Sequence, residues 1–203
     1  MTTSENRTAL VVGASRGLGR GIAAALADTG HDVVPLSRTS SGKPAEEVAD
    51  ATDADTARRL LTKHQPGALV LVAGASPQMM TLPEHTWETF SVNWHADVRI
   101  TFEWLRAALL LPLRPGSRVV VISSGAAING SPLSGGYAGA KATQRLITGY
   151  AQQEADRLGL GLSFTAVLPR LTPLTALGRT AVQAYADRSG LSEQDYRARL
   201  GDR

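Results

Sequence analysis

The chain has 203 residues, of which 43% are hydrophobic and 19% charged, and it contains no cysteine. This length and composition suit one folded domain over residues 1–203 and exclude general disorder, disulfides and thiolate metal sites. The formal net charge is +3, and the arginines are scattered among acids, so we expect no nucleic-acid partner. No apolar run is long enough to cross a membrane and the start is polar, so we expect no membrane association and a cytoplasmic location.

Apolar runs and helical stretches alternate along the chain. A strand is predicted at 8–12, followed by a glycine-rich turn, a helix over 20–28 and a second strand at 31–37. The runs 69–73, 118–123 and 162–168 predict further strands, separated by helical stretches at 55–63, 86 to about 111 and 136–158. Nearly continuous apolar runs are typical of strands buried on both faces. The alternation therefore predicts an α/β fold with a doubly wound parallel sheet.

The turn after the first strand carries glycines at Gly13, Gly17 and Gly19. Glycines between a strand and a helix let backbone N–H groups approach a pyrophosphate, although such a turn can also serve close packing alone. An acidic residue at the end of the second strand would indicate NAD, but that strand ends at Arg38, and Arg16 lies within the turn. Guanidinium groups suit a 2′-phosphate, so the two arginines together favour NADP. The alternative is that both are exposed surface arginines that bind no ligand.

Three polar residues follow the strand at 118–123. Ser124 stands at its carboxyl end, where open α/β sheets bind ligands, and Tyr137 and Lys141 are four residues apart on one helical face. A lysine ammonium favours the phenolate form of a tyrosine, which makes the phenol useful as a proton donor and acceptor. Each of these residues alone would suggest a cap, a packed aromatic or a solvated charge, so the argument rests on their joint occurrence.

With these motifs the chain resembles a short-chain dehydrogenase/reductase of the compact type, from about residue 8 to about residue 168. The matching segments are residues 13–19, Val72-Ala-Gly74, Asn93, Ser124 and the Tyr137-x-x-x-Lys141 pair. The resemblance implies a Rossmann-like fold with Tyr137 as the acid/base and Ser124 orienting the substrate oxygen. It further implies that Lys141 supports the tyrosine and holds the nicotinamide ribose, and that Asn93 supports a relay water.

The resemblance also implies a short third strand around 47–49 and a cofactor site that runs along the sheet. The residues expected at this site are Gly13, Ser15, Arg16, Gly17, Leu18, Gly19, Arg38, Asp50, Ala51, Ala73, Gly74, Tyr137, Lys141, Pro169, Leu171 and Thr172.

Four features depart from the family pattern. The family's Asn-Asn-Ala-Gly is Leu71-Val-Ala-Gly74 here, and its Pro-Gly after the sixth strand is Pro169-Arg170. The crossover from 38 to 50 is short enough to lack a helix. After the sixth strand come helix-like segments at 175–187 and 192–200, so the usual last edge strand is expected to be absent, in either a naturally short member or a truncated chain. The segment 171–199 is expected to form part of a lid over an apolar substrate pocket.

The function expected from the resemblance is an NADPH-dependent reduction of a ketone or aldehyde to an alcohol, or the reverse. A related activity on a carrier-bound ketone stays open, and so does a catalytically silent NADP sensor of the same fold, which would bind the nucleotide without turnover. The four histidines show no ligand spacing, so no metal is expected. A homodimer or homotetramer is expected because family members commonly pair through the long helices.

Overall fold

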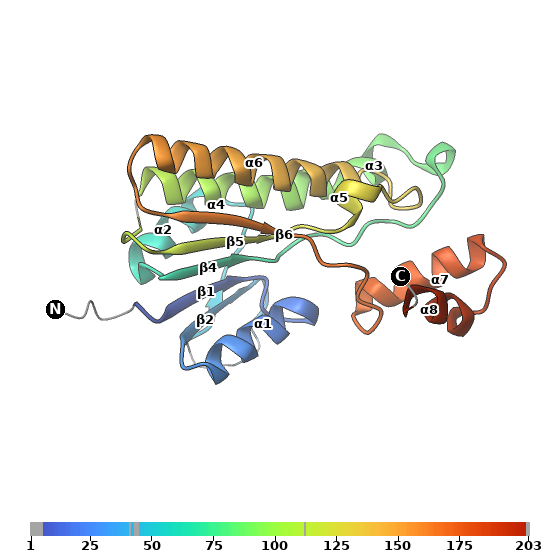
Figure 1. The fold of residues 1–203 in the computed structure, drawn as a ribbon, viewed down its shortest axis with the longest axis horizontal. Helices are drawn as coiled ribbons and strands as arrows, with labels where there is room; N and C mark the ends of the chain where they lie inside the picture. Colours follow the sequence, from blue (N-terminus) through green and yellow to red (C-terminus); the bar gives the residue numbers. More distant parts are fainter. Residues whose placement is uncertain (1–5, 41, 43–44, 112, 202–203) are drawn as a thin grey trace.

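A parallel sheet of six strands forms the centre of the computed structural model, which describes residues 6–40, 42, 45–111 and 113–201 (Figure 1). The strands are β1 (Thr8–Val12), β2 (Asp32–Ser37), β3 (Glu47–Val48), β4 (Ala68–Leu71), β5 (Arg118–Ile122) and β6 (Ser163–Val167). Their spatial order is β3-β2-β1-β4-β5-β6, and every pairing is parallel. This order confirms the Rossmann-like doubly wound sheet. Its direction of winding reverses between β1 and β4, which is where such sheets bind ligands.

Helices cover the two faces of the sheet unequally (Figure 1). On one face lie α2 (Ala54–His64), α4 (Arg99–Leu110) and α6 (Tyr137–Arg157), and on the other lies α1 (Gly17–Asp28). The larger core cluster joins α2, α4 and α6 to the sheet around Leu10, Leu69 and the fully buried Trp104. A smaller cluster packs α1 against Val11 and Val70. The continuous apolar runs of β1 and β4 arise because both of their faces are covered.

The stretch predicted as one helix from 86 to about 111 is divided into three pieces. Thr86 caps α3 (Trp87–Asn93) by accepting the Thr89 N–H. A π-helical turn, η2 (Trp94–Val98), then joins α3 to α4. Within this wider turn the Asp97 carbonyl accepts from the side chains of Thr101 and Gln144, at 2.9 and 3.1 Å. Turns of this kind are frequent at functional sites.

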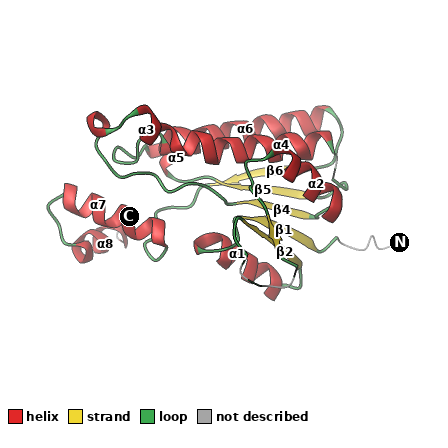
Figure 2. Cartoon of the chain, turned by 180° about the vertical axis from the view of Figure 1, so that it is seen from behind, coloured by secondary structure: helices red, strands yellow, loops and turns green. Residues whose placement is uncertain are grey.

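The chain leaves the sheet after β6, which forms an edge. Two further helices, α7 (Ala176–Arg188) and α8 (Glu193–Gly201), lie beyond the carboxyl ends of the strands and not over the sheet (Figure 2). A short η1 (Leu82–Glu84) and α5 (Ala126–Asn129) complete the elements. The described residues between β2 and β3 contain no helix. Among the helices of the described residues, none is both long and apolar enough to cross a membrane.

Candidate active site

A cavity of about 920 Å³ opens along the carboxyl ends of the strands. Its size falls within the range of small-molecule and cofactor sites. Its lining contains every residue predicted above for the cofactor site, and Ser124 as well. Of the four predicted catalytic residues, Asn93 alone is not among the lining residues, and it is fully buried behind the cavity.

The glycine-rich turn between β1 and α1 owes part of its composition to packing. Gly13 has a φ of +99°, and a Cβ there would lie 2.6 Å from backbone atoms of Ala73. A Cβ at Gly19 would collide with the Gly13 carbonyl oxygen. Gly13 therefore lets the turn approach the segment after β4, and Gly19 lets the start of α1 approach the end of β1, as a dinucleotide fold requires.

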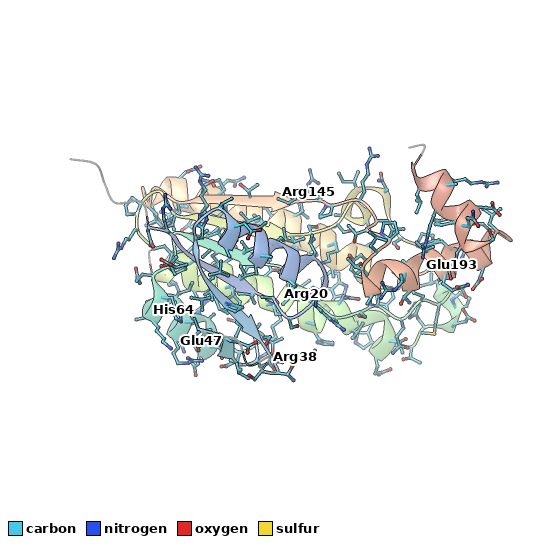
Figure 3. The ribbon with its side chains drawn as sticks, turned by 90° about the horizontal axis from the view of Figure 1, so that it is seen from below. Arg20, Arg38, Glu47, His64, Arg145 and Glu193 are labelled. Atoms are coloured by element: carbon cyan, nitrogen blue, oxygen red, sulfur yellow. The ribbon has the colours of Figure 1, made fainter. Side chains whose placement is uncertain are left out.

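The N-terminus of α1 is open toward an anion. Arg16 occupies the N-cap position without a capping side-chain hydrogen bond, and the first turn holds no acidic residue. The backbone N–H groups of this turn are consequently without a side-chain acceptor, and the helix dipole favours negative charge beside them. Arg16 and Arg38 are both exposed, and Arg38, labelled in Figure 3, follows directly on β2.

Asp50 and Ala51 follow β3 and form one wall of the cavity. The pKa of the Asp50 carboxyl is lowered chiefly by the hydrogen bond from the Thr52 N–H, then by the Thr52 hydroxyl, with a smaller contribution from the charge of Arg38. The Ala51 carbonyl accepts from Trp104 Nε1 at 3.0 Å. This wall is thus fixed from the core side by α4.

Tyr137, Lys141 and Ser124 all line the cavity. Tyr137 begins α6, and Lys141 lies one turn later with its Nζ 5.4 Å from the centroid of the Tyr137 ring. Ser124 follows β5, and its Oγ accepts the Ala126 N–H at 3.2 Å. The cavity lining thus offers a hydroxyl, a phenol and an ammonium, a set able to bind and protonate a carbonyl oxygen.

Lys141 has two side-chain partners that the sequence analysis missed. Its Nζ lies 3.1 Å from Asp97 Oδ2, 2.9 Å from Gln144 Oε1 and 3.4 Å from the Ile122 carbonyl oxygen. Asn93 joins this group through its Nδ2, which donates to the Ala75 carbonyl at 2.8 Å and to Asp97 Oδ1 at 3.2 Å. The available signal was the spacing: Asp97 is an acid four residues after Asn93 in a helical stretch.

The segment after β6 supplies the outer part of the cavity. Leu171, Leu177 and Tyr185 line it, whereas Leu174 is 86% exposed and lies outside. The Tyr185 hydroxyl is 2.7 Å from Ser131 Oγ, which ties α7 to the loop before α6. Among the described residues, no group of three or more histidine, aspartate or glutamate side chains could hold a metal ion.

Comparisons with known proteins agree with this geometry. A sequence model described as short chain dehydrogenase matches residues 7–185. A hydroxynaphthalene reductase-like protein of Metarhizium majus is 34% identical over 156 residues, which are 67% of this chain and 58% of that protein. The chain thus spans little more than half the length of this relative.

Two further proteins are similar over more of the chain. An NADPH-dependent aldehyde reductase-like chloroplastic protein of Arabidopsis thaliana is 27% identical and covers 86% of this chain and 76% of its own length. A crystal structure of a short chain dehydrogenase from Mycobacterium avium superposes with a TM-score of 0.75 at 23% identity, covering 84% of this chain and 70% of its own. The family match covers most of the residues that form the sheet and the cavity, and on that evidence the chain belongs to the short-chain dehydrogenase family.

Proposed function

We propose that the protein is an NADPH-dependent oxidoreductase that reduces a ketone or aldehyde to an alcohol, or runs the reverse reaction, with Tyr137 as the acid/base. The observation that carries the proposal is the position of Lys141 Nζ, 5.4 Å from the Tyr137 ring centroid in a cavity at the carboxyl ends of the strands. A positive charge beside a phenol has a direct use in proton transfer. The reductase names of two relatives support the same reaction class.

The described residues fit a nicotinamide dinucleotide. The uncapped N-terminus of α1 suits the pyrophosphate, and the exposed Arg16 and Arg38 suit a 2′-phosphate because guanidinium binds phosphate through two parallel hydrogen bonds. Asp50 and Ala51 stand beside Arg38, where the adenosine would lie. Tyr137 and the residues after Pro169, which also line the cavity, would hold the nicotinamide end. The name of the Arabidopsis relative, which includes NADPH dependence, agrees with this choice.

The chain's own residues divide the work on the substrate. When bound, the cofactor supplies or accepts the hydride. Ser124 Oγ orients the substrate oxygen by hydrogen bonding. Tyr137 donates its hydroxyl proton to that oxygen during reduction and takes it back during oxidation. Leu171, Leu177 and Tyr185 shield the reacting atoms from water on the outer side of the cavity.

The test combines nucleotide binding with turnover. Purified protein is titrated with NADPH and NADH, and NADPH oxidation is then followed against a panel of ketones, aldehydes and quinones. Tyr137→Phe should still bind NADPH but lose at least about hundredfold in kcat, the contribution typical of a positioned proton donor. Tyr150→Phe is the matched control, because this tyrosine lies on the same helix, is 59% exposed and is not among the residues lining the cavity.

Each result separates the candidate functions. Turnover that is lost in Tyr137→Phe and kept in Tyr150→Phe supports the oxidoreductase. NADPH binding without turnover on the whole panel favours the nucleotide sensor, and the absence of binding to either nucleotide contradicts the cofactor assignment.

We also propose that copies of the chain associate through the outer faces of α4 and α6. These two helices pack together, and each exposes large apolar side chains, among them Phe102 and Leu146, both 52% exposed. Apolar side chains of this size on a helical face favour an interface. Light scattering should show an oligomer that Phe102→Asp dissociates, and a monomeric wild-type protein would contradict the proposal.

A further inference from the structure

A buried ion pair lies directly behind the proposed proton donor. Asp97 is 1% exposed and Lys141 6% exposed, and their charged atoms are 3.1 Å apart. Asp97 comes from the π-helical turn η2 and Lys141 from α6. A buried carboxylate or ammonium is costly unless it is paired and hydrogen-bonded. Both ions therefore depend on each other for their place in the fold.

The two oxygens of Asp97 have separate partners. Oδ1 accepts the Ala75 N–H at 2.8 Å and the Asn93 side-chain amide at 3.2 Å. Oδ2 faces Lys141 Nζ. One carboxylate thus fixes the turn after β4 with one oxygen and the ammonium with the other. This division allows the two contacts to be tested separately.

The ammonium of Lys141 has three protein partners. It donates hydrogen bonds to Gln144 Oε1 and to the Ile122 carbonyl oxygen, and it forms an ion pair with Asp97 Oδ2. Gln144 is itself held, because its Nε2 donates to Thr101 Oγ1 at 2.6 Å and to the Asp97 carbonyl at 3.1 Å. Side chains of η2 and α6 thus hold the ammonium beside the Tyr137 ring.

We infer that Asp97 is a positioning residue for the reaction: it holds the Lys141 ammonium beside Tyr137, so that the lysine acts on the phenol as a fixed charge. This inference rests on the proposed function, because it assigns a role within the same proton-transfer site. Asp97 touches neither the substrate nor the phenol in this role and acts through Lys141.

The isosteric variant Asp97→Asn isolates the contact with Lys141. Its amide oxygen can keep the bonds from Ala75 N and Asn93 Nδ2, while its amide nitrogen replaces the oxygen that faces Lys141 Nζ. Two hydrogen-bond donors then oppose each other, and the ammonium must move. We expect kcat to fall about tenfold to a hundredfold. The matched control is Asp53→Asn, the same change at the N-cap of α2, which should leave kcat unchanged.

A double-mutant cycle shows whether Asp97 acts through Lys141. Lys141→Met should lower kcat, because the phenol loses the positive charge beside it. In that background, Asp97→Asn should cost no further activity. Equal losses from Asp97→Asn in both backgrounds would overturn the inference, as would wild-type kcat in Asp97→Asn.

A spectroscopic readout tests the geometry without turnover. The chain has three lysines, Lys43, Lys63 and Lys141, so ¹⁵N-lysine labelling gives few ammonium signals, and Lys141→Met assigns the one of interest. We expect a Lys141 signal protected from exchange with water in the wild type and lost in Asp97→Asn, while Asp53→Asn retains it. An unprotected wild-type signal overturns the inference even if the enzyme is active. A protected signal in a protein without NADPH turnover would instead place the failure in the proposed function.

Discussion

Replacing Gly74 by alanine tests the rigidity of the Asp97 site through stability. A Cβ at Gly74 would lie 2.7 Å from Asp97 Oδ2 and 2.8 Å from Oδ1, distances that Cβ contacts do not tolerate. A flexible carboxylate could rotate away at little cost. This one is tied to Lys141, Ala75 and Asn93, so relief of the clash must break a buried contact.

The expected cost follows from this constraint. Overpacking a buried site costs about 1–3 kcal/mol, and in a chain of this length each kcal/mol shifts the Tm by about 2–4 °C. Gly74→Ala should therefore lower the Tm by about 2–12 °C. Gly149→Ala is the matched control, because Gly149 lies within α6 and a Cβ there would meet nothing within 4 Å. That change should stabilise the helix by about 0.5–1 kcal/mol and raise the Tm.

Thermal and urea unfolding measure the two stability changes, which should be opposite in sign: a loss in Gly74→Ala and a gain in Gly149→Ala. Because Asp97 positions Lys141 in our inference, Gly74→Ala should also lower kcat, while Gly149→Ala should not. A Gly74→Ala protein as stable as the wild type would show that Asp97 moves freely, and the argument for a rigid site would then be refuted.

Three further predictions concern other parts of the molecule. Arg38→Ala should raise the KM for NADPH by about tenfold to a hundredfold, the value of a charge-assisted hydrogen bond, and leave the KM for NADH unchanged; equal effects on both nucleotides would contradict the 2′-phosphate assignment. Trp104→Phe should lower the free energy of unfolding by about 1–3 kcal/mol, because the Ala51 carbonyl loses its buried donor; urea unfolding measures this. The pKa of Glu47 is held below its ordinary value of 4.5, chiefly by its hydrogen bond with Lys63. This carboxylate therefore stabilises the fold above pH 4.5, and the contribution is lost as the pH falls through the lowered pKa. Glu47→Gln should flatten the acid side of the curve of unfolding free energy against pH, and an unchanged slope would count against the Glu47–Lys63 pair.

The fold could be predicted from the sequence because its main signals are local and strong. The runs at β1, β4 and β5 are apolar on both faces, which is typical of a covered parallel sheet. The glycines beside β1 and the Tyr137–Lys141 spacing then indicated the end of the sheet at which a ligand binds. In the structure, the residues predicted from these signals line one cavity.

The arrangement behind the cavity could not be predicted in the same way. The π-helical turn between α3 and α4 has a partner on α6, since Gln144 donates to the Asp97 carbonyl. Helical periodicity along one segment contains no information about such a partner. An aspartate in a helical stretch is normally a solvated charge, and its burial becomes understandable only with Lys141 in place.

Gly74 shows how the two kinds of information combine. The family resemblance predicted it as part of the cofactor site, and it does line the cavity. The structure adds a second reason for a glycine there, because any side chain at this position would meet the Asp97 carboxylate. The turn after β4 lacks the family's asparagines, and the same carboxylate accepts the Ala75 N–H of this turn. One buried acid from η2 therefore accounts for the position of Lys141, the anchoring of the turn and the need for glycine at 74, which is why its substitution should affect kcat and stability together.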